Sequence, residues 1–130
     1  MTQEEKQMLL KDLCARLPYE TWVQYEGKEW LVTGYGHGRV SLLPSAFSSV
    51  GGPCPLVEEV RPYLRPMSSM TEEELKWYYN KLTIIEESRI RRQKHIEELN
   101  DWLLSHYFDY RGLIEKGLAL KASNNMYKTE

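Results

Sequence analysis

Three polar residues in the C-terminal part of the chain, His106, Asp109 and Arg111, have types and spacing that could support polar chemistry. A histidine and an aspartate three residues apart at the end of a helix can share a proton or a metal ion. The alternative interpretation is structural: His106 caps the last carbonyls of a helix, and Asp109 pairs with Arg111. We favour the structural interpretation and keep the three residues as a weak polar-site candidate.

The rest of the sequence offers no catalytic motif. His37 lies in a glycine-rich turn and His95 on a charged helix face, and neither has a partner at metal-ligand spacing. There is no Gly-x-Ser-x-Gly motif, and the local sequence suggests no Cys–His pair. The glycines at positions 34, 36 and 38 do not continue at the dinucleotide spacing. We therefore expect a protein that is not an enzyme and that uses no metal and no cofactor.

A second candidate site is a basic cluster made of Arg89, Arg91, Arg92 and Lys94. Together with aromatic residues of the N-terminal half, this cluster could bind nucleic acid. Four glutamates flank it at helical spacing and would cancel much of its field: Glu86, Glu87, Glu97 and Glu98. A solvated helix face is the preferred interpretation, and nucleic-acid binding is the alternative.

The aromatic composition favours an interface. The chain has nine Tyr and four Trp but only two Phe. Tyr and Trp carry a polar group on an apolar ring, so they suit half-buried surfaces and interfaces as well as cores. The possible interaction surface combines three aromatic residues with the basic cluster: Trp22, Trp30 and Tyr35 with Arg89, Arg91, Arg92 and Lys94.

Length and composition limit the class of protein. A chain of 130 residues with 42% apolar and 28% charged residues suits a single globular domain. The net charge of −2 is spread evenly, so neither half has the positive field that nonspecific nucleic-acid binding uses. Cys14 and Cys54 make no disulfide framework, and we expect both to be reduced and at least partly buried. The polar N-terminus and the lack of a long apolar run predict a cytoplasmic protein without a membrane segment.

Residues 61–74 divide the chain into two parts. Pro62 and Pro66 favour extended backbone, so we expect an extended linker over residues 61–70. Thr71 and Glu74 then supply both halves of a capping box, which predicts the start of a helix. Before this stretch the sequence favours one helix followed by strands and turns, and after it the sequence favours helix.

The part before the divide predicts an α+β fold. Thr2 and Glu5 form another capping box, and leucines at helical spacing predict a helix over residues 3–16. We expect the polar face of this helix to lie in water: Glu5, Lys6, Lys11, Asp12 and Arg16. A β section over residues 21–60 follows, in which a small antiparallel SH3-like meander of three to four strands packs on the helix. The expected strands are 21–25, 29–33 and 39–43, with a tight turn at 26–28 and a bulge or turn at 34–38.

Three further predictions concern loops, helices and the tail. The loop over residues 44–56 is the longest, and we expect it to be mobile. The helical section 71–108 should contain two helices, about 72–82 and 87–107, with a bend near Thr83; one continuous helix is the alternative. In the tail over residues 109–130, glycines at 112 and 117 can adopt positive φ, leucines return to the core, and the last ten residues fray.

Four stretches of the chain resemble a known family. They are residues 1–19, 23–28, 61–74 and 101–120, and their most specific motifs are RPYLRPMSSMTEEE and DWLLSHYFDYRGLIEKGLAL. This pattern is similar to that of small, phage-related proteins from gut Bacteroides-type bacteria, a family with no assigned activity. The chain departs from it at Tyr107, where the family often has a second histidine, and at residues 121–126, which replace an acidic, proline-containing end. The resemblance implies a phage or mobile-element origin and a bacterial host, but no mechanism.

We therefore expect a non-enzymatic protein-interaction module, an accessory protein of a phage or mobile element, which binds a protein partner or a second copy of itself. The alternative is a nucleic-acid-binding module that uses the small barrel and the Arg89–Lys94 face. A hydrolase or metal enzyme built around His106 and Asp109 is the third possibility.

Overall fold

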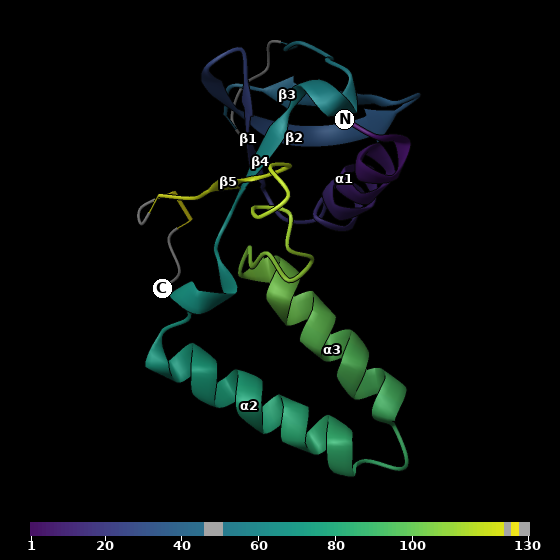
Figure 1. Cartoon of the computed structure of the whole chain (residues 1–130), viewed down its shortest axis with the longest axis vertical. Helices are drawn as coiled ribbons and strands as arrows, with labels where there is room; N and C mark the ends of the chain where they lie inside the picture. Colours follow the sequence, from purple (N-terminus) through teal and green to yellow (C-terminus); the bar gives the residue numbers. More distant parts are fainter. Residues whose placement is uncertain (46–50, 124–125, 128–130) are drawn as a thin grey trace.

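The computed structural model describes residues 1–45, 51–123 and 126–127. The fold is α+β: a helix and a five-stranded sheet form one end of the molecule, and two C-terminal helices extend from it as a hairpin (Figure 1). We call these parts the sheet end and the helical hairpin. The elements in chain order are α1 (Gln3–Ala15), β1 (Trp22–Tyr25), β2 (Lys28–Gly36), β3 (Arg39–Leu43), η1 (Val57–Glu59), β4 (Arg61–Leu64), η2 (Met67–Ser69), α2 (Glu72–Glu87), α3 (Arg92–Ser105) and β5 (Leu120–Lys121).

The sheet has the strand order β3-β2-β1-β4-β5. Neighbouring strands are antiparallel except for β4 and the two-residue β5, which run parallel. The predicted tight turn joins β1 to β2 through Glu26 and Gly27, whose φ angles of 51° and 74° suit a two-residue hairpin. The predicted turn is present at His37 and Gly38, whose φ angles are 54° and 75°, but β2 continues through Gly36, and the shift in the β2–β3 register lies between Val32 and Gly34, at the start of the predicted stretch. The meander is therefore confirmed, β5 was not predicted, and the SH3-like description stays a prediction.

Residues 61–64 form β4 and are not a linker. The two prolines do keep the backbone extended, as expected, but this extended segment pairs with β1. Val23 lies opposite Pro62, and Gln24 lies opposite Arg61. Because Leu64 is fully buried, the segment also contributes to the core. The extended conformation that proline imposes is thus used for sheet pairing.

The core at the sheet end lies between the sheet and α1. Its buried side chains are Leu9, Leu13, Val23, Val32, Val40, Leu42, Val57 and Val60. The capping box that starts α1 is present, because Thr2 Oγ1 accepts from the N–H of Glu5 and the Glu5 carboxylate accepts from the N–H of Thr2. A second cluster packs Leu64 of β4 against Leu113, Leu118 and Ala119. The predicted return of tail leucines to the core is therefore confirmed for residues 113 and 118.

The helical section contains two helices, as predicted, but the break lies later than expected. The capping box of Thr71 and Glu74 starts α2, which continues through Thr83 to Glu87. The Thr83 hydroxyl donates to the carbonyl of Tyr79, 3.0 Å away, so this β-branched residue is accommodated inside the helix. The chain turns at residues 88–91, where Arg91 adopts a left-handed φ of 64°. The predicted bend near Thr83 is therefore wrong.

Two predictions about exposure are also wrong. Cys14 is half-buried as expected, but Cys54 is exposed, because its segment runs along the outer edge of β3. Residues 46–50 of the predicted mobile loop lie outside the described residues, whereas Pro53 and Pro55 accept backbone hydrogen bonds from β3. The tail is not wholly frayed, because the Tyr127 side chain is buried.

None of the helices that the structure describes is long and apolar enough to cross a bilayer.

Candidate functional site

His106 has the structural role that the sequence favoured. It ends α3, and its Nδ1 lies 2.9 Å from the carbonyl oxygen of Trp102. Because a carbonyl only accepts hydrogen bonds, Nδ1 carries the proton in this arrangement. The ring packs beside two aromatic side chains that also contact each other, with its centroid 4.7 Å from Trp102 and 6.4 Å from Phe108. The imidazole is thus a helix cap at the edge of an aromatic cluster.

Asp109 does not pair with Arg111, so this part of the structural interpretation is wrong. Its carboxylate accepts hydrogen bonds from the backbone N–H groups of Leu113 and Ile114, at 2.8 and 2.9 Å. Those bonds hold a turn and occupy both oxygens. Among the described residues, Asp109 forms no hydrogen bond or ion pair with His106. The histidine and the aspartate therefore do not form a shared proton or metal site.

The polar face predicted for α1 contains a buried ion pair. Asp12 and Arg16 have fully buried side chains, with Arg16 Nε 2.8 Å from Asp12 Oδ2. Arg16 Nη2 also donates to the carbonyl of Phe108, 2.7 Å away and 92 residues later in the chain. Arg111 Nε lies 3.2 Å from Asp12 Oδ1, which adds a second cation to the same carboxylate. The prediction that Asp12 and Arg16 lie in water is wrong, because the turn after α3 covers this side of α1.

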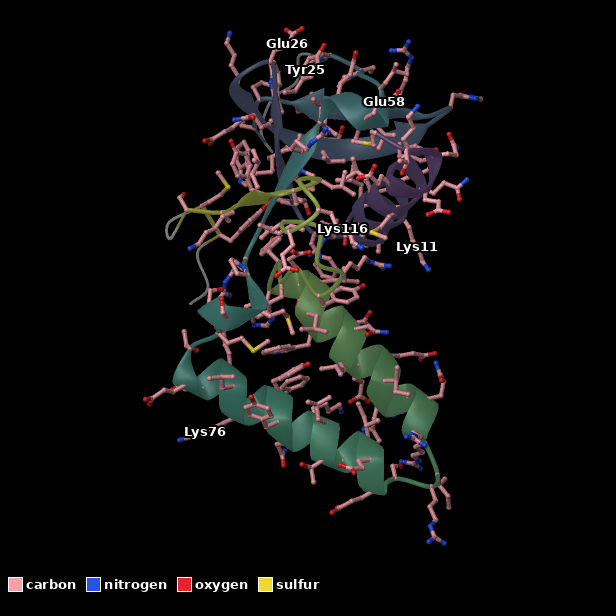
Figure 2. The ribbon with its side chains drawn as sticks, in the orientation of Figure 1. Lys11, Tyr25, Glu26, Glu58, Lys76 and Lys116 are labelled. Atoms are coloured by element: carbon pink, nitrogen blue, oxygen red, sulfur yellow. The ribbon has the colours of Figure 1, made fainter. Side chains whose placement is uncertain are left out.

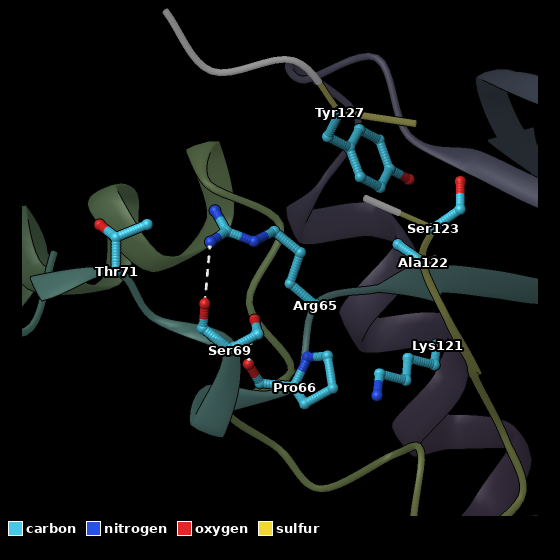
Figure 3. Close-up of a pocket in the computed structure, with 8 residues that line it drawn as sticks. All are labelled: Arg65, Pro66, Ser69, Thr71, Lys121, Ala122, Ser123 and Tyr127. Carbon is cyan, nitrogen blue, oxygen red and sulfur yellow. Dashed lines mark hydrogen bonds between the residues drawn. The ribbon is translucent and has the colours of Figure 1, made fainter. Parts of the chain in front are cut away.

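A polar pocket of about 270 Å³ opens where β4 leads into α2 (Figure 3). It combines two cationic side chains with four hydroxyl groups, a composition that would suit an anion. The guanidinium of Arg65, however, already forms a two-pronged pair with Glu74, at 3.0 and 2.7 Å. It also lies 4.3 Å from the ring centroid of Phe108. The lining residues are Arg65, Pro66, Ser69, Thr71, Lys121, Ala122, Ser123 and Tyr127.

The hydroxyl groups of this pocket are mostly occupied as well. The Tyr127 hydroxyl accepts from the N–H of Trp22 at 2.8 Å and donates to the carbonyl of Tyr63 at 2.9 Å. Burial raises the pKa of the Tyr127 hydroxyl above its ordinary value, so it stays a neutral donor. The Ser69 hydroxyl donates to the backbone, and the Thr71 hydroxyl caps α2. The polar groups that line the pocket therefore stabilise the junction between the sheet end and the helical hairpin.

The structure does not bring the predicted interaction surface together. Trp22 and Trp30 are half-buried in the sheet, and Tyr35 is exposed near the end of β2. The basic cluster lies in and just after the turn between α2 and α3, at the opposite end of the molecule (Figure 1). Its four side chains are exposed, and no ion pair involves them in the described part of the chain. Arg89 and Arg91 therefore lie in the turn, and Arg92 and Lys94 lie in the first turn of α3.

A polar cluster that sequence reasoning missed joins the two helices of the hairpin. The amine of Lys81 lies 3.0 Å from His95 Nδ1 and donates a short hydrogen bond to the Glu98 carboxylate. This hydrogen bond holds the pKa of the Glu98 carboxyl below its ordinary value. Lys81 also lies 5.9 Å from the ring centroid of Trp77. His95, predicted on a charged helix face, therefore takes part in a contact between helices.

Aromatic side chains fill the rest of the contact between α2 and α3. The rings of Trp77 and Trp102 stack with centroids 4.4 Å apart and planes 17° apart. Behind them, Leu99, Leu103 and Phe108 form the buried centre of the hairpin base. The inner face of α2 is therefore covered by α3.

The outer face of α2 carries an exposed apolar stripe among polar side chains. Leu75, Tyr79 and Leu82 follow one another at i, i+4 and i+7, so they form one stripe, and they are 36%, 62% and 36% exposed. We call these three residues the outer stripe. Lys76 beside it points away from α3 (Figure 2). Five of the seven exposed large apolar side chains in the described chain lie between residues 75 and 90: Leu75, Trp77, Tyr79, Leu82 and Ile90.

The described residues contain no group of three or more histidine, cysteine, aspartate or glutamate side chains that could hold a metal ion. At the sheet end the buried Asp12 and Arg16 side chains bind each other, whereas the hairpin presents apolar and charged side chains to solvent. The candidate functional site is therefore the hairpin surface. Comparison of the chain with protein-family models, with curated proteins and with solved structures finds no match.

Proposed function

We propose that this chain is a non-enzymatic protein-interaction module whose contact surface is the outer face of α2. The observation that carries the proposal is the outer stripe. Single exposed apolar residues are ordinary on protein surfaces, but a stripe at i, i+4 and i+7 is the pattern by which a helix contacts a partner. The middle residue, Tyr79, is the most exposed of the three, and Tyr is a residue type that contributes strongly to interfaces.

The construction of the hairpin supports the same proposal. Two helices packed on each other cover one face of each helix, and the other faces need solvent or a partner. The inner face of α2 packs on α3 through Trp77 and Trp102, so the outer stripe is not needed to hold the hairpin together. An apolar surface that the fold does not need is available for binding.

Charges border the outer stripe. Glu72 lies one turn before Leu75, and Glu86 lies one turn after Leu82, both on the same side of the helix. Such rim charges contribute more to the choice of partner than to affinity. The resemblance to phage-related proteins implies an accessory context, and the binding role itself is inferred from the outer stripe.

Site-specific photo-crosslinking tests the proposal. A photoreactive phenylalanine analogue replaces Tyr79 in the full chain, in cells that naturally make it, and we expect an adduct with a protein of defined mass. Tyr35 is the matched control, since it is an exposed tyrosine at the other end of the molecule, and the analogue placed there should give no such adduct. Equal adducts from both positions, or none from position 79, would contradict the proposal.

A further inference from the structure

An exposed apolar side chain lies within the basic cluster. Ile90 stands between Arg89 and Arg91 in the turn from α2 to α3, and at 81% it is the most exposed large apolar side chain of the described chain. The hydroxyl of Ser88 donates to the carbonyl of Ile90, so a hydrogen bond closes the backbone of this turn. We call the basic cluster together with Ile90 the tip.

The tip lies at the far end of a projecting hairpin (Figure 1). The 14 residues of α3, at a rise of about 1.5 Å per residue, place the tip roughly 20 Å from the base of the hairpin. At physiological salt the Debye length is about 8 Å, so the charges of the sheet end are screened at the tip. The tip is therefore able to contact a flat surface alone.

The tip differs in charge from the rest of the chain. The chain has 17 basic and 19 acidic residues, so without the four basic residues of the tip the remainder has 13 against 19. All four are exposed, and none forms an ion pair in the part of the chain that the structure describes. A molecule with this distribution approaches an anionic surface with its tip first.

Nearby glutamates weaken the field of the tip without neutralising it. Glu86 and Glu87 end α2 just before the turn, Glu97 lies further along α3, and Glu98 is bound to α2. Among the described residues no ion pair joins any of them to the tip. The break at residues 88–91 also ends the helical spacing by which the sequence suggested a cancellation of charge across the turn. The basic side chains therefore stay available to an external anion.

We infer that the tip binds the surface of a bilayer that contains anionic phospholipids. The arginine and lysine side chains bind the lipid phosphates, and Ile90 enters the boundary between the headgroups and the acyl chains. This contact goes beyond the proposed function and uses none of the residues of the outer stripe, so either proposal can fail without the other.

The composition of the tip favours a bilayer over a nucleic acid. Residues 89–94 read Arg-Ile-Arg-Arg-Gln-Lys and contain no aromatic side chain that could stack on bases. The phosphates of a duplex would engage the basic side chains but would leave Ile90 in water. A bilayer offers a partner to both, because phosphates lie directly above an apolar layer.

The small size of the tip sets the strength of the binding. Even a whole myristoyl chain gives only marginal and reversible attachment to a bilayer, and Ile90 is far shorter. The basic side chains add to this attachment, and each contributes modestly near an anionic surface. The binding is therefore reversible, and added salt weakens it.

Co-flotation of the full chain with lipid vesicles tests the inference. Vesicles of equal parts phosphatidylglycerol and phosphatidylcholine should carry the chain at low salt, and vesicles of phosphatidylcholine alone should not. Raising the salt to about 0.5 M should release the chain. Absence of flotation with the anionic vesicles at low salt, or equal flotation with both kinds, overturns the inference.

Substitutions test the apolar part of the contact. Ile90→Ser should weaken binding to the anionic vesicles by about tenfold, because it removes the apolar side chain of the tip. Leu82→Ser is the matched control, since Leu82 is an exposed apolar residue of α2 outside the tip, and it should leave the affinity unchanged. Equal losses from the two variants overturn the placement of the contact at the tip.

A second pair of substitutions tests the charged part. Lys94→Gln should weaken binding by about fivefold, which is the contribution expected of one basic residue near an anionic surface. Lys76→Gln makes the same change at an exposed lysine of α2 outside the tip and should have little effect. An affinity that is the same for Lys94→Gln as for the wild type contradicts the inference.

Titration with duplex DNA, at the same salt and the same total phosphate, separates a bilayer from phosphates in general. We expect weaker binding to the DNA than to the anionic vesicles, and no effect of Ile90→Ser on the DNA affinity. If the chain binds DNA as tightly as the vesicles and Ile90→Ser changes neither affinity, the tip is a nonspecific phosphate contact and the inference is wrong.

Discussion

The sheet end and the helical hairpin use the same kind of ion pair in different surroundings. At the sheet end, both side chains of the Asp12–Arg16 pair are 0% exposed, and the pair also binds the backbone after α3. In the hairpin, Lys81 is almost buried, but the side chain of its partner Glu98 is 44% exposed. A buried carboxylate depends on its cation, whereas an exposed one can be solvated by water. The Asp12–Arg16 pair is therefore needed for the fold, and the Lys81–Glu98 pair contributes less to it.

The largest effect is expected from breaking the pair at the sheet end. Arg16→Met leaves the Asp12 carboxylate buried with only Arg111 nearby, and it leaves the Phe108 carbonyl without its donor. We expect the free energy of unfolding, measured by urea denaturation, to fall by about 3–5 kcal/mol. Lys11→Met, an exposed position on the same helix, is the control and should have little effect. A loss as small as that of a surface pair, about 1 kcal/mol or less, would remove the distinction between the two regions.

A smaller effect is expected at the junction of the two regions, where Arg65 pairs with Glu74. Glu74→Gln keeps the capping box, because glutamine also serves at that position, but it removes the charge. We expect a loss of roughly 1–2 kcal/mol in the free energy of unfolding at neutral pH.

This loss should depend on pH. Partial burial alone would raise the pKa of Glu74, but the hydrogen bonds from Arg65 and from the Thr71 backbone outweigh it and hold the pKa below the ordinary 4.5. The stabilisation is therefore complete above about 4.5, and it disappears as the pH falls through the lower pKa of the folded state. The wild type and Glu74→Gln should converge in acid, and Glu73→Gln should show no such convergence. A constant difference across the pH range would show that the charge does not matter.

The smallest effect is expected in the hairpin. Lys81→Met keeps the apolar stem beside Trp77 and removes the cation, and the half-exposed Glu98 can then be solvated. We expect urea denaturation not to separate this variant from the wild type. The pKa of the Glu98 carboxyl, followed by NMR, should rise toward 4.5 because its hydrogen bond from Lys81 is gone. A stability loss comparable to that of Arg16→Met would show that both ion pairs contribute equally to the free energy of unfolding.

Local signals made much of the fold predictable. Both capping boxes, Thr2 with Glu5 and Thr71 with Glu74, involve residues three positions apart, and both are present. The β1–β2 turn is equally local, because a glycine marks the positive φ that it needs. Where a feature depends on a few neighbouring residues, the local sequence was sufficient to predict it.

Features that depend on distant segments were not predictable. The spacing of Asp12 and Arg16 fits an exposed pair on a helix, and only the Phe108 segment, 92 residues from Arg16, makes it a buried one. The exposure of the outer stripe also depends on a distant segment. Leu75, Tyr79 and Leu82 belong to one helical period with the inward-facing Tyr78 and Ile85, and the position of α3 decides which of them stay exposed.

The candidate site was predicted in part. Composition predicted a basic cluster from Arg89 to Lys94, and the break between α2 and α3 divides it between the turn and the start of α3. Nothing in the local sequence marks that break, because no proline or glycine occurs between residues 67 and 111. Trp22 and Trp30 were grouped with this basic cluster only because aromatic and basic residues are both common in interfaces. Residue type does not indicate how far apart two residues lie in the fold.

The exposure of Cys54 has a practical consequence. Burial raises the pKa of the Cys14 thiol, and the thiolate is the reactive form, so an alkylating dye at neutral pH modifies Cys54 first. The segment that carries this thiol pairs with the outer edge of β3, and β3 lies far from the turn of the hairpin (Figure 1). A fluorophore or a solid support can therefore be attached to the unmutated chain at a place that leaves α2 open to whatever binds it.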